Sequence, residues 1–168
     1  PHASFMPKVR EICSRHGILL IADEVITGFG RSGDWTGARH WGVKSDFSCI
    51  AKAITNGYFP FGAVMIAEEI AETFETDTSG SAVIGSGYTY SGHPVGAAAA
   101  LATLKETKRL KVNENAAVRG DELLAGCQGL MAKHDVIGDV RGKGLMVALE
   151  LVSDRDAKTP SSKDVTAS

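Results

Sequence analysis

The sequence has few cysteines, little net charge and no long apolar run, and each shortage excludes a class of protein. Its three cysteines, Cys13, Cys49 and Cys127, are widely spaced and odd in number, which favours reduced thiols in a cytoplasmic protein over a disulfide framework. The net charge is only -2 and Lys and Arg form no basic stripe, so neither nucleic acid nor an anionic membrane surface is an expected partner. The longest apolar stretch, residues 94–104, is far shorter than the ~20 residues of a membrane span.

What the sequence does contain is the composition of a globular protein with a core. Hydrophobic residues make up 43% and charged residues 23% of its 168 residues, with 19 glycines, as in one soluble domain or parts of two. The chain begins at Pro1 rather than Met and ends in the polar run 161–168, so we expect an internal piece of a longer polypeptide. His16, His40 and His134 have no partners at metal-ligand spacing, so no metal site is expected.

Helical and strand patterns alternate along the chain, which predicts an α/β protein with a largely parallel sheet. A helix is expected to end at Gly17, followed by a strand over 18–22 that is apolar throughout and therefore covered on both faces. Further strands are expected at 47–50 and 62–67, and helices from Pro94 to about Arg109 and after Asn113. Residues 136–152 read as extended structure interrupted by glycines.

The residues that could carry chemistry are Asp23 and Lys52, because each follows an apolar strand. Open α/β sheets bind ligands at the carboxyl ends of their strands. A carboxylate there can keep a heterocyclic nitrogen protonated, and a partly buried amine can form a Schiff base. The residues alone leave two plainer interpretations open: Asp23 caps a helix or pairs with an arginine, and Lys52 is simply solvated.

Five ordered motifs resemble those of class III pyridoxal-phosphate aminotransferases. They are LIADEVITGFGRSG at 20–33, AKAITNGY at 51–58, FGAV at 61–64, GYTYSGHPV at 87–95 and VRGKGL at 140–145. The resemblance covers nearly the whole chain except the tail after about Lys158. It implies the fold type I (aspartate aminotransferase-like) architecture. Residues 1–110 would be the C-terminal part of the large cofactor-binding domain, with part of its sheet, and 111–168 the incomplete beginning of a small α+β domain.

The resemblance also implies a role for each matched residue. Lys52 would be the catalytic residue, forming the internal aldimine with pyridoxal 5'-phosphate and then moving the substrate proton. Asp23 would accept a hydrogen bond from the pyridine nitrogen, and Val25 would pack on one ring face. Thr89 would contact the cofactor phosphate, which in this family usually lies on the neighbouring subunit. A homodimer with its site at the subunit interface is therefore implied.

Ile26 stands where several branches of the family have glutamine, which favours the omega-amino-acid and amine:pyruvate branch. The implied reaction moves an amino group from an amine or omega-amino acid to an α-keto acid such as pyruvate. An alternative is a non-catalytic fragment of the same family, because the Gly-Ser phosphate loop and the aromatic residue that stacks on the ring are absent. A third, a nucleotide-binding loop at GFGRSG, is disfavoured because no helical pattern follows it. Arg141 and His93 are interpreted as structural.

Overall fold

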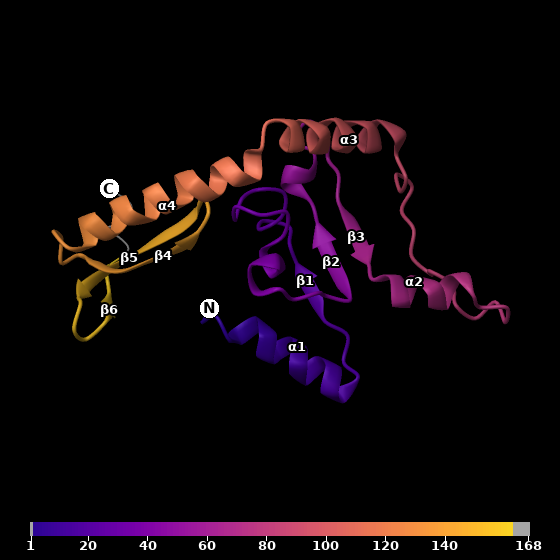
Figure 1. Ribbon diagram of the computed structural model, residues 1–168, viewed down its shortest axis with the longest axis horizontal. Coiled ribbons are helices and arrows are strands. Elements are labelled where there is room, and N and C mark those ends of the chain that lie inside the picture. The colour runs from indigo at the N-terminus through magenta and orange to yellow at the C-terminus, as the bar shows by residue number, and fades with distance from the viewer. Residues whose placement is uncertain (1, 163–168) are drawn as a thin grey trace.

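A computed structural model describes residues 2–162 of the chain as two small sheets joined by two helices (Figure 1). The helices and strands, in chain order, are α1 (Phe5–His16), β1 (Ile21–Asp23), η1 (Gly37–Trp41), β2 (Phe47–Ile50), η2 (Lys52–Ile54), β3 (Ala63–Ile66), α2 (Glu68–Glu75), α3 (Pro94–Arg109), α4 (Val112–Met131), β4 (Ile137–Lys143), β5 (Met146–Asp154) and β6 (Thr159–Pro160). No helix within residues 2–162 is long and apolar enough to cross a membrane.

The first sheet has the order β1-β2-β3 and is mixed rather than largely parallel. β1 and β2 run parallel, with Ile21 opposite Phe47, whereas β2 and β3 are antiparallel, with Ile50 opposite Ala63. The prediction of a largely parallel sheet is therefore wrong for β3. Residues 51–62, which join β2 to β3, contain only the three-residue η2, whereas a parallel neighbour is usually reached through a crossover helix.

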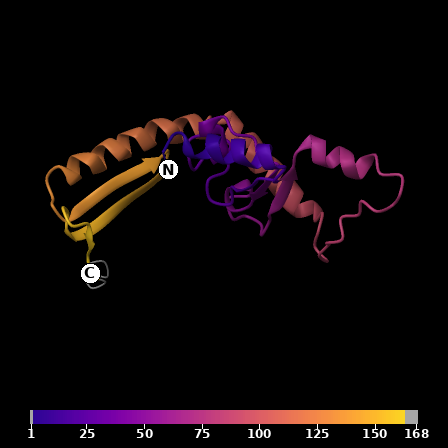
Figure 2. The same cartoon turned by 90° about the horizontal axis from the view of Figure 1, so that it is seen from below.

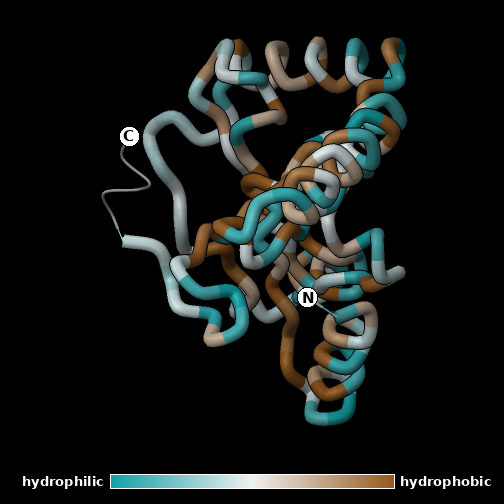
Figure 3. Tube along the Cα trace, turned by 90° about the vertical axis from the view of Figure 1, so that its left-hand side faces the viewer, coloured by the Kyte–Doolittle hydropathy of each residue, from teal (hydrophilic) through white to brown (hydrophobic). Residues whose placement is uncertain are grey.

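One face of β1 is uncovered within the described residues. Ile21 is more than half exposed, whereas Ala22 and Glu24 on the other side are buried. Ile18 and Leu19, which precede the strand, are also more than half exposed. The prediction of a strand over 18–22 covered on both faces is thus wrong in two respects: β1 begins only at Ile21, and one of its faces is open. The hydrophobic residues of this region are visible on the tube of Figure 3.

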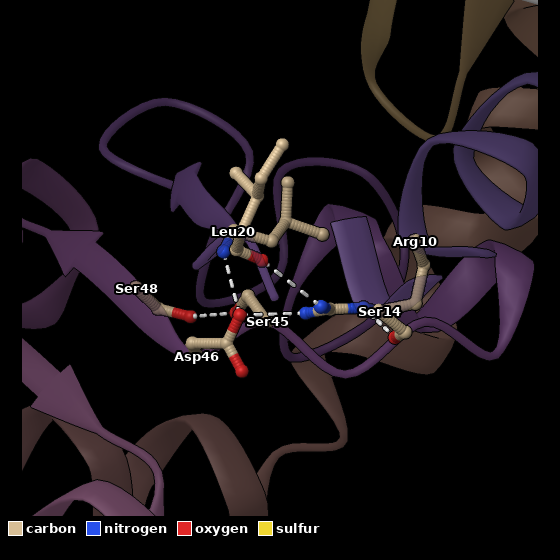
Figure 4. A network of polar contacts seen from close by, with 7 residues as sticks. Arg10, Ser14, Leu20, Ser45, Asp46 and Ser48 are labelled. Atoms are coloured by element: carbon tan, nitrogen blue, oxygen red, sulfur yellow. Dashed lines mark hydrogen bonds and ion pairs between the residues drawn. The ribbon is translucent and has the colours of Figure 1, made fainter. Parts of the chain in front are cut away.

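An ion pair between Arg10 of helix α1 and Asp46 holds the helix against the amino ends of β1 and β2 (Figure 4). Gly17 ends the helix in the left-handed conformation with φ 63°, as predicted. Arg10 Nη1 lies 2.7 Å from Asp46 Oδ2, which also accepts a 2.5 Å hydrogen bond from the Leu20 N–H. The Arg10 hydrogen bond, followed by that from Leu20, holds the pKa of Asp46 below its ordinary value of 3.8. The charge pair therefore fixes the chain immediately before β1.

The second sheet is an antiparallel hairpin of β4 and β5 with the short β6 added at its edge. Helix α4 lies along one face of this sheet (Figure 2), and Cys127 packs with Ile137 and Val140 in a buried cluster. The strand β6 falls in the tail where no element was predicted. Residues 163–168 of the predicted small domain lie outside the described residues, and the boundary after residue 110 stays a prediction.

The loop after β1 connects the two halves of the structure, because it contacts α4 and the β4–β5 turn. The Leu145 N–H donates to the Arg31 carbonyl over 3.0 Å, and a Cβ on Gly33 would come within 3.0 Å of Ala117. A Cβ on Gly144 would collide with the backbone of Ser32. Glycine is required at these close approaches because any side chain would push the two segments apart. The loop after β1 is thereby held between both sheets.

Candidate active site

The structure brings Asp23 and Lys52 to the same edge of the first sheet. Asp23 is the last residue of β1 and lies opposite Cys49 of the parallel strand β2. Lys52 follows two residues after the end of β2, at the start of η2. Since the carboxyl ends of parallel neighbours share one sheet edge, both side chains belong to that edge. The apolar runs before Asp23 and Lys52 predicted this placement.

The backbone around Lys52 is held in an uncommon conformation. Lys52 has φ 49°, a left-handed value that costs a non-glycine residue energy and is found often at functional sites. The Thr55 N–H donates to the Lys52 carbonyl over 3.2 Å. Thr55 itself is 1% exposed, and its hydroxyl donates to the Phe59 carbonyl over 2.6 Å. A buried, hydrogen-bonded threonine thus fixes the turn that carries the lysine.

Helix α3 supports this turn from outside the sheet. Ile50 and Ile54, on either side of Lys52, form a buried cluster with Ala100 of α3. Gly96 lets the helix approach closely, because a Cβ there would clash with the ring of Phe61. The Lys52 side chain is nevertheless exposed, so the partial burial expected of it is absent within residues 2–162. The amine makes no hydrogen bond or ion pair with any described residue.

Asp23 is also exposed, and its carboxylate can accept further hydrogen bonds. Its Oδ1 accepts a 3.1 Å hydrogen bond from the Val25 N–H, and no described arginine or lysine pairs with it. The interpretation of Asp23 as an ion-pair partner is therefore wrong for the described residues. Val25 is half-buried and follows Asp23 by two residues.

Glu24 is a buried anchor whose role was not predicted. It is 3% exposed and accepts hydrogen bonds from the N–H groups of Gly37 at 2.7 Å and Ala38 at 2.8 Å. The Thr27 hydroxyl donates to it as well. This carboxylate closes the loop between β1 and η1. The period-2 alternation of a strand, which buries Ala22 and Glu24 on one side, could have revealed it.

Thr89 is not brought to Asp23 or Lys52 by this chain. It is exposed, in a turn within the segment between α2 and α3, and that segment lies on the far side of β3 from β1 (Figure 1). No hydrogen bond within the described part of the chain joins Thr89 to the other three residues. Its predicted role at the phosphate remains a prediction that requires a second subunit.

The other candidate groups have structural contacts. His93 is the N-cap of α3, where its Nδ1 accepts from the Val95 N–H at 3.3 Å. Arg141 pairs with Asp139 at 2.6 Å and Glu150 at 2.7 Å, and the Asp139 and then the Glu150 hydrogen bond raise its pKa. Both interpretations as structural residues agree with these contacts.

The glycine-rich loop does not open a helix, as a dinucleotide-binding loop would. Residues 31–36 are irregular, and the next element is the five-residue η1, Gly37–Trp41. Within residues 2–162 no three His, Cys, Asp or Glu side chains are grouped so as to hold a metal ion.

Comparison with known proteins identifies the family. The sequence profile described as "Aminotransferase class-III" matches residues 1–167. The chain is 41% identical over 166 residues to a taurine–pyruvate aminotransferase of Bilophila wadsworthia, covering 98% of the chain and 36% of that protein. It is 39% identical to a putrescine–pyruvate aminotransferase of Pseudomonas aeruginosa, with 94% and 34% covered. The chain therefore belongs to the class III aminotransferases and spans about a third of the length of these relatives.

Solved structures agree in fold. An amine transaminase from an uncultivated Pseudomonas species, solved in its pyridoxal-phosphate-bound form, superposes with a TM-score of 0.92 at 50% identity, covering 98% of this chain and 37% of that one. An (S)-enantioselective omega-transaminase from Thermomicrobium roseum gives 0.90 at 41% identity, with 99% and 36% covered. The α/β fold described above is thus a part of fold type I, as the resemblance implied.

Proposed function

We propose that the protein containing this chain is a pyridoxal-phosphate-dependent aminotransferase with Lys52 as its catalytic residue. The observation that carries the proposal is the shared sheet edge of Asp23 and Lys52, where one strand end presents a carboxylate and the parallel neighbour an amine. The membership of class III supports the same reaction type.

The residues present fit pyridoxal phosphate. Asp23 makes only one hydrogen bond through Oδ1, so its carboxylate can accept another from a protonated ring nitrogen, and Val25 can pack on one ring face. Lys52 Nζ has no partner among the described residues, so it can attach to the aldehyde and afterwards take up and return the substrate proton. When bound, the cofactor supplies an electron-poor ring that accepts the electron pair left when that proton departs.

The proposed substrates follow the relatives' names. Taurine–pyruvate and putrescine–pyruvate aminotransferases both pair an amine donor with pyruvate. We therefore propose an amine or omega-amino acid as the donor and an α-keto acid such as pyruvate as the acceptor. Ile26 supports this branch as the resemblance implied.

We also propose a homodimer in the cytoplasm. Tyr88 is 85% and Tyr90 79% exposed on either side of Thr89, and such a surface suits a subunit interface. In this proposal the Thr89 hydroxyl of one subunit contacts the cofactor phosphate of the other. The cysteines Cys13 and Cys49 are free, which suits a reducing compartment.

Amino transfer can be measured on the polypeptide at its natural length. Purified protein with added pyridoxal phosphate should convert pyruvate to alanine with taurine, putrescine or 5-aminovalerate as donor. A Lys52→Ala variant should lose at least about 10³-fold in kcat, since it removes the nucleophile and the proton carrier together. Lys105→Ala, an exposed lysine on α3, is the matched control and should keep wild-type activity.

No alanine from any donor with the wild-type protein would contradict the proposal. Normal folding without cofactor binding would favour the non-catalytic alternative instead.

A further inference from the structure

Asn56 and Gly57 form the tip of the turn that follows Lys52. The Tyr58 N–H donates to the Thr55 carbonyl over 3.0 Å and closes this turn. Asn56 has φ 49° and Gly57 has φ 80°. Positive φ at both central residues is typical of a type I′ turn, for which Asn-Gly is a preferred pair. The backbone conformation of the turn therefore favours an asparagine directly before a glycine.

No described residue shields the Asn56 side chain or the Gly57 N–H. Both residues are exposed, and neither the Asn56 amide nor the Gly57 N–H is hydrogen-bonded to any of residues 2–162. A Cβ built on Gly57 would have nothing within 4 Å. Because glycine has no side chain, the Asn56 side-chain carbon can approach the Gly57 nitrogen without obstruction. The turn is at the surface and is closed by one hydrogen bond, so local opening can bring the two atoms together.

We propose that Asn56 is a site of spontaneous deamidation. The Gly57 nitrogen forms a bond to Cγ of Asn56, the bond from Cγ to the side-chain nitrogen breaks, and that nitrogen leaves as ammonia with the proton of the Gly57 N–H. Water then opens the resulting succinimide ring at either of its carbonyls, which gives aspartate or isoaspartate at position 56. Water is the only other reactant, and nothing is oxidised or reduced.

The other two asparagines of the chain provide a contrast. Asn113 and Asn115 lie in the first turns of α4, and neither precedes a glycine. Asn113 is only 6% exposed. Asn115 is exposed like Asn56, but the N–H that follows it belongs to the hydrogen-bonded backbone of the helix. Asn115 is therefore an internal reference that has the same side chain and exposure without the reactive backbone.

The carboxylate formed at position 56 would lie beside the candidate site. Asn56 lines one pocket with Arg31 and Lys52, and the Thr55 N–H connects the turn to the Lys52 carbonyl over 3.2 Å. A negative charge near an amine favours its protonated form, whereas attachment to an aldehyde needs the neutral amine. Deamidation should therefore weaken cofactor attachment. This consequence rests on the proposed function, but the deamidation itself does not.

Peptide mapping of stored protein tests the modification without any assay of activity. Folded protein at its natural length is incubated in mildly alkaline buffer, and samples are digested and analysed by mass spectrometry over time. The peptide with Asn56 should gain the mass difference between water and ammonia, and isoaspartate should be detected at position 56. This should occur at least about tenfold faster than at Asn115, which must first leave its helix. In Asn56→Gln, ring closure is slower because the ring is larger, and this peptide should keep its mass.

Direct replacement tests the consequence. Asn56→Asp places the carboxylate in the pocket from the start, and its Kd for pyridoxal phosphate should be about three- to tenfold higher than that of wild type. Asn115→Asp makes the same change on α4 and is the matched control, which should bind the cofactor as wild type does. Circular dichroism establishes that each variant is folded.

An unmodified Asn56, or deamidation no faster than at Asn115, would overturn the proposed site. Cofactor binding by Asn56→Asp as tight as by wild type would overturn the consequence at Lys52. If Asn56 deamidates while fresh wild-type protein transfers no amino group, the proposed function fails and the modification site stands.

Discussion

Replacing Glu24 by Gln tests how the loop between β1 and η1 is held beside the candidate site. The buried carboxylate accepts backbone hydrogen bonds from Gly37 at 2.7 Å and Ala38 at 2.8 Å. Gln keeps the shape and one acceptor oxygen but directs an NH2 group at one of these donors. Losing one charge-assisted hydrogen bond and leaving a buried N–H unpaired costs about 2 kcal/mol. Since 1.4 kcal/mol is a factor of ten, the population of the open loop should rise about 30-fold.

Limited proteolysis measures this opening directly, because Arg31 lies in the loop as a trypsin site. When opening and closing are fast, cleavage follows the population of the open form, so cleavage after Arg31 should accelerate by about 30-fold. Glu122→Gln on α4, whose partner Arg119 forms an exposed ion pair at 2.6 Å, is the control and should leave cleavage unchanged. A Glu24→Gln rate within about twofold of wild type would refute the proposed anchoring, since it corresponds to less than ~0.5 kcal/mol.

Three further predictions concern stability, each measured by urea denaturation. Gly120→Ala should destabilise by about 1–3 kcal/mol because its Cβ would collide with the Gly144 backbone, whereas Gly129→Ala on the same helix, with open space around its Cβ, should stabilise by about 0.5–1 kcal/mol. Arg155→Met should cost about 2 kcal/mol, because Nη2, with two hydrogens to donate, lies within hydrogen-bond distance of the carbonyls of Met131, His134 and Ile137, which join the end of α4 to the start of β4. The pKa of Asp46 is lowered from 3.8 when folded, so its contribution is present above pH 3.8 and is lost as the pH falls through the folded pKa. Asp46→Asn should therefore reduce the loss of stability below pH 3.8, and an unchanged acid profile would contradict this.

Elements whose ends are marked by a proline, a glycine or the limits of an apolar run could be predicted from the sequence. Pro94 at the first turn marked the start of α3, which the structure places at Pro94–Arg109. The apolar run before Lys52 predicted β2, Phe47–Ile50, at its observed bounds. Gly17 marked the end of α1. These patterns are local in the sequence: the apolar run is continuous, and the proline and glycine act through the backbone conformations that they restrict or permit.

What depended on distant contacts could not be predicted. Helix α2, Glu68–Glu75, has only eight residues and no side-chain cap, so it was missed. The antiparallel pairing of β3 goes with a connection that contains only the short η2 and no crossover helix, and the periodicity of the strands does not reveal the direction of pairing. At the site, the strand ends placed Asp23 and Lys52 correctly. That Arg31 lacks a carboxylate partner among residues 2–162 became evident only in the structure, where the other seven arginines each lie within 4.0 Å of one.

The covalent attachment of the cofactor to Lys52 is the most direct test of the account. Protein at its natural length is incubated with pyridoxal phosphate, reduced with borohydride and digested, and the peptides are mapped by mass spectrometry. The account predicts a pyridoxyl group on Lys52, its absence in Lys52→Ala, and no adduct at Lys105. A reduced adduct on another lysine, or none on folded wild-type protein, would contradict the assignment of Lys52 as the catalytic residue.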